Sequence, residues 1–287
     1  MRILRLDPEI TTTRRRLAWL ACGLLPLAMT TIAMAADWRG GAVETLVRES
    51  AHYKLVVLGE MHGTREIPLL AGDLVEHWSM TEPVLLALEI PAGEHAALRA
   101  VVTGHGTDAL TEDVRRRPWW ALPPEQNDGR RSENVLSLVQ RIGVLRGTGR
   151  DVAILPFDPR DIRCYERGNC EAAMAEVLRR AHDALPEGRM VVVVGNLHAM
   201  RRRPTDPASP FAGTTPMAAH LRDLAPISID ITAERGQFWA CQDIDACGPV
   251  NVARSTRGGR QPDDALYDYR LVLPVFTPIR QVDGARN

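Results

Sequence analysis

Four apolar runs, each followed by an acidic residue or a histidine, constrain the fold of this chain more than any other feature. They span 54–58, 84–88, 152–157 and 191–194. Apolar runs of this length, without alternating polar residues, are typical of strands that are buried on both faces of a sheet. Segments with helical spacing of apolar residues lie between them. This alternation predicts an α/β fold with a mainly parallel central sheet and helices on both faces.

The residues that follow these runs predict one shared site. Glu60 and His62 follow the first run, Glu89 follows the second and His198 follows the fourth. Because ligands bind outside the carboxyl ends of the strands in open α/β sheets, these four side chains are expected to converge on one pocket. Two carboxylates and two histidines in one pocket are typical of a hydrolytic, acid–base or metal site.

The segment Gly59-Glu60-Met61-His62-Gly63 carries the strongest local signal. Its glycines allow a tight turn and a close approach to a ligand. An extended backbone places Glu60 and His62 on the same side. Glu66 shares a face with His62 if a helix begins there, although a glutamate also favours the first turn of a helix for purely structural reasons. Asp158 follows the third run and is a weaker candidate, since Asp before Pro is also a common turn signal.

Helices are expected wherever apolar residues recur at helical spacing. The predicted helices span 42–50, 67–78, 94–102, 133–145, 171–184 and 217–224. Ser132 is a suitable cap for the fourth of them. Two late strands, 227–231 and 271–273, have no clear helix between them, which allows an antiparallel edge.

The segment 103–131 is predicted to form a helical and loop lid over the pocket. It is long and rich in Gly, Pro, Asp and Arg, and segments of this kind are more often functional than incidental. Arg130 and Arg131 are candidates for binding an anionic group or an oxyanion, with solvated loop arginines as the alternative. Trp119 and Trp120 are candidates for an aromatic wall of the substrate site, with a core role as the alternative.

The first 36 residues are predicted to be a signal peptide of the Sec or twin-arginine type. Arg14–Arg16 is a basic region, an apolar stretch runs from Leu17 to Ala33, and Ala33-Met34-Ala35 matches a small-x-small cleavage pattern. Residues 37–287 are then one α/β domain that is periplasmic or secreted, without a stable membrane anchor. That domain keeps 30 basic and 34 acidic residues. It has no basic excess that would point to nucleic acid.

Four cysteines remain after the signal peptide, in two closely spaced pairs: Cys164 with Cys170, and Cys241 with Cys247. An even number of cysteines in an exported chain favours disulfides, and pairing within each pair is expected. A four-thiolate zinc site is the alternative, but zinc ligands are usually more closely spaced. The sequence contains no Gly-x-Ser-x-Gly elbow, no His-Glu-x-x-His motif and no phosphate-binding loop.

Three short motifs resemble one superfamily. They are Gly59-Glu60-x-His62-Gly63-x-x-Glu66, Leu88-Glu89 and Gly195-Asn196-x-His198-Ala199. In this order they are similar to the erythromycin esterase-like hydrolases, the haem-binding ChaN-like proteins and the TIKI (TraB) proteins. The pair Trp119-Trp120 and the segment from Arg130 resemble the esterase-like branch.

The resemblance implies a function for the matching residues. In the esterase-like branch His62 would activate water, Glu60, Glu66 and Glu89 would orient or polarise, and His198 would be the second histidine. The TIKI-like branch implies a divalent metal held by similar residues. The candidate ligands here are Glu60, His62, Glu89 and His198, and their mixed oxygen and nitrogen ligation suits zinc or manganese. The chain is therefore predicted to be a hydrolase of an ester, lactone or amide in a small-molecule or peptide substrate. The alternatives are a ChaN-like haem- or iron-binding protein without catalysis, and a scaffold that binds a partner through its Trp-containing loop.

Overall fold

The computed structural model describes residues 25–159, 164, 167–243 and 245–282. The chain divides into two compact units, Met1–Gly41 and Ala42–Asn287. Helix α1 (Leu25–Ser50) contains the predicted helix 42–50, in which Leu46 is completely buried. Most of the predicted signal peptide lies outside the described residues, so its cleavage stays a prediction. No described helix is both long and apolar enough to cross a membrane.

The second unit is built on a mainly parallel sheet, as the apolar runs predict. Its seven described strands lie in the order β3-β2-β4-β1-β5-β9-β8. The bounds are β1 Leu55–Glu60, β2 Val84–Pro91, β3 Val152–Asp158, β4 Arg189–Gly195, β5 Ile227–Ala233, β8 Gly259–Arg260 and β9 Tyr269–Leu273. All neighbours from β3 to β9 pair in parallel. The carboxyl ends of six strands therefore meet at one edge of the sheet.

The antiparallel edge is present, but a different strand forms it. The two predicted late strands, β5 and β9, pair in parallel with each other, and the short β8 pairs antiparallel with β9 at the edge. A parallel connection needs a long crossover, and residues 234–268 provide it with no helix among their described residues. Part of that crossover is an antiparallel hairpin of β6 (Gln237–Cys241) and β7 (Cys247–Asn251), which no apolar pattern indicates.

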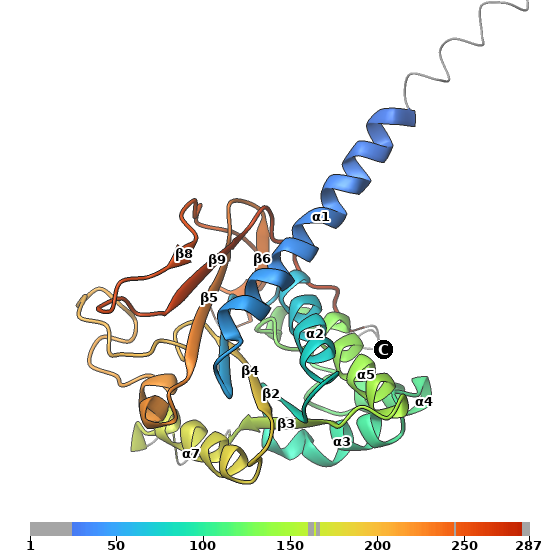
Figure 1. The fold of residues 1–287 in the computed structure, drawn as a ribbon, viewed down its shortest axis with the longest axis horizontal. Coiled ribbons are helices and arrows are strands. Elements are labelled where there is room, and N and C mark those ends of the chain that lie inside the picture. The colour runs from blue at the N-terminus through green and yellow to red at the C-terminus, as the bar shows by residue number, and fades with distance from the viewer. Residues whose placement is uncertain (1–24, 160–163, 165–166, 244, 283–287) are drawn as a thin grey trace, which may run out of the picture. The chain divides into compact units, whose positions relative to one another are not determined.

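Helices cover both faces of the sheet, as Figure 1 shows. Alternate residues of the central strands, such as Leu55 and Val57, pack in one cluster with residues of α7 (Cys170–Asp183) and the 3₁₀ helix η3 (Ala218–Leu224). The intervening residues point to the opposite face. The helices on that opposite face in Figure 1 are α2 (Glu66–Trp78), α3 (His95–Thr103) and α5 (Glu133–Gly147).

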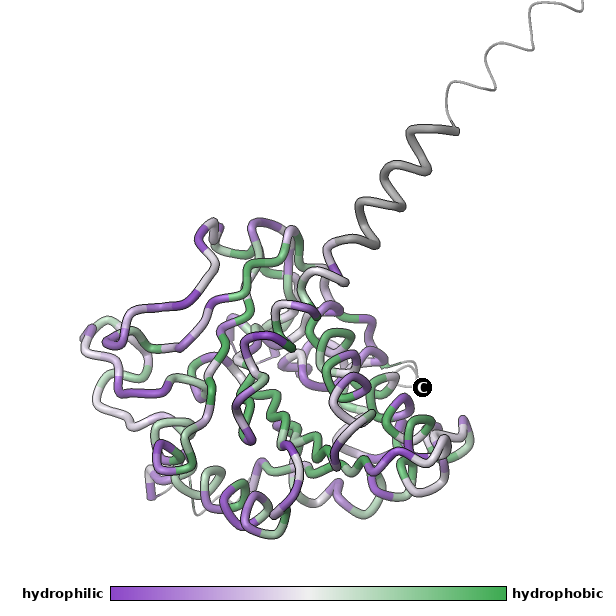
Figure 2. The backbone as a smooth tube through the Cα atoms, in the orientation of Figure 1, coloured by the Kyte–Doolittle hydropathy of each residue, from purple (hydrophilic) through white to green (hydrophobic). Residues whose placement is uncertain are grey.

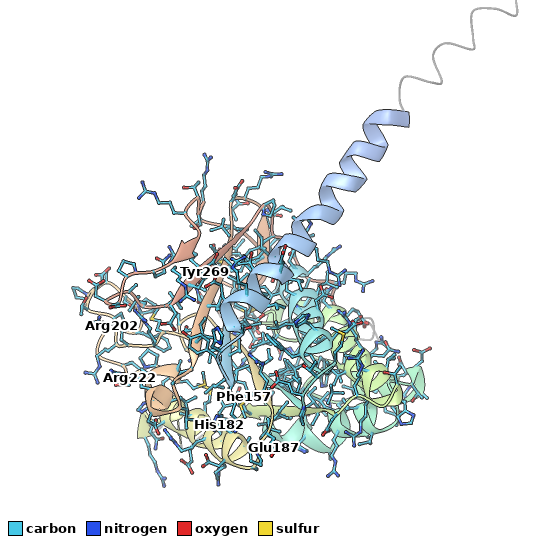
Figure 3. All side chains as sticks on the ribbon, in the orientation of Figure 1. Phe157, His182, Glu187, Arg202, Arg222 and Tyr269 are labelled. Atoms are coloured by element: carbon cyan, nitrogen blue, oxygen red, sulfur yellow. A yellow bond between two sulfur atoms is a disulfide. The ribbon has the colours of Figure 1, made fainter. Side chains whose placement is uncertain are left out.

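The core is concentrated in the central strands. In Figure 2 these strands are strongly hydrophobic, whereas the connecting segments are mostly hydrophilic. In Figure 3 Phe157 lies within the fold near α7, and its side chain is completely buried. Arg202 and Arg222 lie at the margin of the molecule in the same view. This distribution explains why unbroken apolar runs identify the strands correctly.

The predicted helices are present with small shifts at their ends. Ser132 caps α5, because its side chain accepts a hydrogen bond from the backbone N–H of Val135 at 3.1 Å. The region predicted as one helix over 94–102 is the short 3₁₀ helix η1 (Ala92–Glu94) followed by α3. The last predicted helix, 217–224, has 3₁₀ geometry in η3.

The predicted lid segment, 103–131, contains α4 (Asp108–Arg115) and the 3₁₀ helix η2 (Pro124–Gln126). Its last residues run back towards the carboxyl edge of the sheet, where Arg130 contacts β2 and β3. Whether the segment moves as a lid stays a prediction.

Both predicted cysteine pairs are joined. A disulfide links Cys164 to Cys170 at the start of α7, and a second links Cys241 to Cys247 across the β6–β7 hairpin. Each bridge closes a short loop. Two disulfides are compatible with an extracellular or periplasmic protein.

Candidate active site

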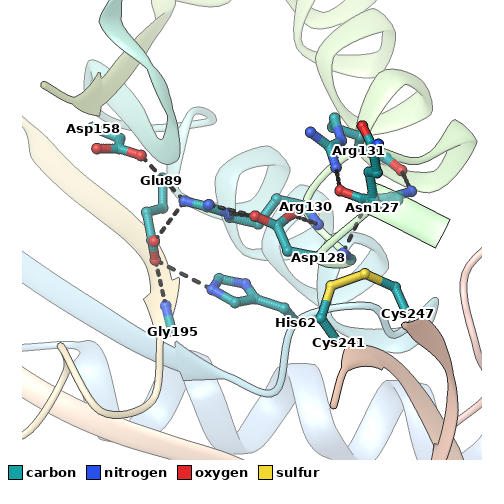
Figure 4. A network of polar contacts seen from close by, with 12 residues as sticks. His62, Glu89, Asn127, Asp128, Arg130, Arg131, Asp158, Gly195, Cys241 and Cys247 are labelled. Carbon is teal, nitrogen blue, oxygen red and sulfur yellow. Dashed lines mark hydrogen bonds and ion pairs between the residues drawn. A yellow bond between two sulfur atoms is a disulfide. The ribbon is translucent and has the colours of Figure 1, made fainter. Parts of the chain in front are cut away.

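The strand ends bring three of the four predicted residues into direct contact, and the fourth lies at the edge of this group. Glu89 lies at the centre, between His62 and Arg130 (Figure 4). The Nε2 atom of His62 lies 3.4 Å from Glu89 Oε2, and the Nε2 atom of His198 lies 3.9 Å from Glu89 Oε1. Both imidazole rings therefore direct the same nitrogen towards one carboxylate.

His62 lies between two carboxylates. Its Nδ1 atom is 2.8 Å from Oε1 of Glu60, two residues earlier, and its Nε2 atom faces Glu89. Burial lowers the pKa of His62, but Glu89 and Glu60 outweigh this effect and raise it to about 10. At neutral pH His62 is therefore a positively charged imidazolium in the free site.

Glu89 is held as an anion by three groups. Its Oε2 atom accepts a hydrogen bond from the backbone N–H of Gly195 at 2.8 Å, and its Oε1 atom accepts one from Nη1 of Arg130 at 2.8 Å. Burial raises the pKa of Glu89, but His62 and Arg130 lower it well below its usual range. A charged carboxylate that is only 7% exposed is tolerated because it is fully paired.

Gly195 leaves the space in which these groups meet. A Cβ atom at this position would lie 2.9 Å from Nε2 of His62 and 3.5 Å from Oε2 of Glu89. Any side chain there would displace the imidazole. The glycine at the end of β4 therefore keeps the backbone close to both charged groups.

Glu171 is a member of the site that the sequence analysis did not identify. Its Oε1 atom lies 2.7 Å from Nδ1 of His198, and its Oε2 atom accepts the backbone N–H of Met217 at 2.8 Å. Burial lowers the pKa of His198, but the hydrogen bond that its ring donates to Glu171 and the charge of Glu89 raise it overall. Glu171 follows Cys170 in the first turn of α7. A glutamate is common at this position for structural reasons, so the sequence carries no signal that it belongs to the site.

Arg130 connects the lid segment to three carboxylates. Its Nη1 atom donates to Glu89 and, at 3.2 Å, to Oδ2 of Asp158, while its Nη2 atom donates to Oδ2 of Asp128 at 2.5 Å. Burial raises the pKa of Asp158 to about 6, although Arg130 opposes this shift. The guanidinium thus binds acidic side chains of the protein itself, and it holds the carboxylate of Glu89 in place.

Close backbone packing brings the His62 loop, the lid segment and the β6–β7 hairpin together. Gly63 and Gly129 both have positive φ, and a Cβ atom on either would collide with the backbone of Trp239. The indole Nε1 of Trp239 also donates to the carbonyl of Asn127 at 2.8 Å. Only glycine fits at these two positions, so the hairpin holds Arg130 and His62 at their places in the site.

Four other predicted residues lie away from Glu89. Glu66 accepts the backbone N–H of Thr277 at 3.0 Å, so it fastens the start of α2 to the C-terminal segment. Trp120 is buried and donates to Glu94 at 3.2 Å. Trp119 packs edge-on against Trp120, and Arg131 lies over Trp119. The contacts of Glu66, Trp119 and Trp120 fit their structural alternatives, whereas Arg131 is only 3% exposed and is not the solvated arginine of its alternative.

The arrangement does not favour a metal bound by Glu60, His62, Glu89 and His198. Among the residues that the structure describes, no group of three or more His, Cys, Asp or Glu side chains is arranged to hold a metal ion. Both ring nitrogens of His62 face carboxylates. A metal would have to replace these ion pairs. The zinc, manganese and haem alternatives therefore stay predictions to be tested by titration.

Known structures share this fold. A mutant of the erythromycin esterase EreC, in its open conformation, superposes with a TM-score of 0.60 at 12% sequence identity, covering 84% of this chain and 95% of that chain. The chain has an erythromycin esterase-like fold. The type III effector HopBA1 superposes with a TM-score of 0.50 at 16% identity, covering 82% of this chain and 94% of that chain. A protein from Bacillus cereus gives 0.50 at 12% identity, covering 79% and 90%.

These likenesses establish the fold alone, because the sequence identities are low. No protein-family model matches the sequence, and no curated protein matches it. The ChaN-like and TIKI-like parts of the predicted resemblance are not shown by these structures and stay predictions. The activity has to be argued from the site itself.

Proposed function

We propose that this protein is an exported hydrolase of the erythromycin esterase-like type, which cleaves an ester, lactone or amide with water. The observation that carries the proposal is the pair of imidazoles around Glu89, each with a carboxylate on its Nδ1 atom. Glu60 lies on Nδ1 of His62 and Glu171 lies on Nδ1 of His198. A carboxylate on Nδ1 sets the tautomer and orientation of an imidazole and leaves Nε2 for proton transfer.

The two histidines suit different steps. In the neutral form of His62, Nδ1–H donates to Glu60, and Nε2 accepts the proton of the attacking water. His198 donates no hydrogen bond from Nε2 to any described residue. Its protonated form can donate to the oxyanion that forms when water adds to the carbonyl carbon. Collapse of this intermediate expels the alcohol or amine, which takes the proton held by His62.

His62 is the general base only after it loses the proton that Glu89 and Glu60 stabilise. Since burial and these two carboxylates set its pKa at about 10 in the free site, kcat/KM is expected to rise from pH 7 towards pH 10. A substrate that separates His62 from Glu89 would remove part of this stabilisation and release the base. Arg130 acts as a positioning residue, because it holds Glu89 in place.

The function is tested with purified mature protein on a panel of esters, lactones and amides, with and without a chelator. His62→Ala is expected to lower kcat by about 100-fold or more, the usual contribution of general acid–base catalysis. His220→Ala is the matched control, because His220 is an exposed histidine on η3. Equal hydrolysis by parent and His62→Ala would exclude His62 as the base, and loss of activity in the chelator would revive the metal alternative.

A further inference from the structure

The carboxyl edge of the sheet carries a second group of polar residues, on the other side of β1. Asp230 on β5 and Arg270 on β9 are in register, and Nε of Arg270 donates to Oδ2 of Asp230 at 2.8 Å. Asp230 is also in register with Gly59, the residue before Glu60. The pair therefore lies at the same edge as the candidate active site, but over the β5–β9 half of the sheet.

A cavity of about 200 Å³ lies next to this ion pair. It is lined by Met61, Asn196, Asp230, Thr232, Ser255 and Arg270. Met61 lies between Glu60 and His62 in the chain, and Asn196 directly follows Gly195. The cavity thus shares its wall with the segments that carry the two histidines.

The ion pair has hydrogen-bonding capacity that the protein does not use. Asp230 has a side chain that is only 8% exposed, and its Oδ1 atom accepts no hydrogen bond from a described residue. Within the same part of the chain, the two terminal amino groups of Arg270 donate none. The Arg270 side chain is 36% exposed, so water or a ligand can reach these unused donors from the cavity.

We propose that this cavity is a substrate subsite that binds one neutral, hydroxyl-rich ring, a single sugar unit, beside the bond to be cleaved. The proposal rests on the proposed hydrolase function and adds the substrate class to it. Asp230 and Arg270 supply an acceptor and donors side by side. Neighbouring hydroxyls of a sugar offer donors and acceptors at matching positions.

The charge balance favours a neutral ligand over an anion. The carboxylate of Asp230 offsets the charge of Arg270, so the pair has no net charge with which to attract a carboxylate or phosphate. The other polar residues that line the cavity, Thr232, Ser255 and Asn196, are neutral and can both donate and accept hydrogen bonds. The volume corresponds to about seven water molecules, which is room for one small ring.

Binding is measured first, because it does not depend on catalysis. Methyl glucoside is titrated into the mature protein and into Arg270→Met, with Arg116→Met as the matched control, because Arg116 is an ion-paired arginine at the C-cap of α4 that does not line the cavity. We expect Arg270→Met to bind the sugar about 10- to 100-fold more weakly, the usual effect of losing hydrogen bonds to a charged group. Thr232→Val is the second variant, because Arg270→Met leaves the nearly buried Asp230 carboxylate without its ion pair and is expected to lower stability. It is expected to weaken binding without altering the circular dichroism spectrum.

Hydrolysis is measured second, with methyl 6-O-acetylglucoside and cyclohexylmethyl acetate as a pair that differs in the ring hydroxyls. The parent is expected to prefer the sugar ester, and Arg270→Met to lose that preference. Hydrolysis of both esters at equal rates, or tighter binding of glucuronate than of methyl glucoside, would overturn the subsite and leave the hydrolase intact. Sugar binding that depends on Arg270, without hydrolysis of any ester, lactone or amide in the panel, would support the subsite and overturn the hydrolase.

Discussion

Glu89 is the residue on which the electrostatics of the candidate site depend. It accepts hydrogen bonds from Gly195 and Arg130 and faces both imidazoles. Its negative charge stabilises the protonated form of each histidine. Removing this charge should therefore shift the pH dependence of catalysis while the fold is kept.

Glu89→Gln is expected to lower the pKa of His62, because Glu89 is the largest favourable influence on the protonated ring. The loss of one close charge should move the rising limb of kcat/KM to lower pH by about 1 to 3 pH units. The measurement is a pH–rate profile together with an NMR titration of the His62 ring. Glu187→Gln, at an exposed position, should leave both unchanged. A profile that keeps its midpoint in Glu89→Gln would contradict the assignment of the limb to His62.

At the scale of elements, α7 links a disulfide to the second histidine. Cys170 begins the helix, its bridge to Cys164 anchors that end, and Glu171 is the next residue. Glu171 then holds His198 through Nδ1. The position of an imidazole at the end of β4 thus depends on a covalent bond at the start of a helix on the face of the sheet.

The double variant Cys164→Ser/Cys170→Ser is expected to lower the pKa of His198, since a less firmly placed Glu171 stabilises the imidazolium less well. The free energy of unfolding should fall by about 2 kcal/mol, as for a bridge that closes a short loop. NMR titration of His198 and urea unfolding are the measurements. Cys241→Ser/Cys247→Ser is the matched control: it should lower stability in the same way but keep the Glu171–His198 contact, so that the pKa of His198 changes less. A His198 pKa that is equal in all three proteins would disprove the link.

At the scale of the whole molecule, the sheet places residues from distant parts of the chain at one edge. The lid segment adds Arg130 and the β6–β7 hairpin adds the backbone of Trp239, so neither the strands nor the loops form the site alone. The two disulfides are compatible with folding in an extracellular or periplasmic compartment.

Export of the full chain in a bacterium is expected to yield a protein that begins at Ala36 or Asp37 and contains two disulfides. The reason is the cleavage pattern at 33–35 and the close approach of the two cysteine pairs. Intact mass spectrometry with and without reductant, on periplasmic and cytoplasmic fractions, measures both features. Retention of residues 1–35 in the exported protein would show that the segment is not a cleaved signal.

Much of the fold follows from local patterns. The unbroken apolar runs identify β1 to β4, and the cap at Ser132 marks the start of α5. The strand-end positions of Glu60, His62, Glu89 and His198 also follow, because parallel strands present their carboxyl ends at one edge. The β6–β7 hairpin could not be predicted from such patterns, because its half-exposed strands are short and carry no apolar run.

The sequence by itself determined the sheet and the edge at which the acids and histidines meet, because backbone burial and side-chain periodicity are local properties. Only the tertiary structure decided their partners. Glu66 accepts a hydrogen bond from Thr277, Glu171 accepts one from His198, and Arg130 donates one to Glu89. The partners are 27 to 211 residues apart in the chain. The physical reason is that a buried charge requires a partner, and which partner lies within reach depends on how the loops pack across the sheet edge.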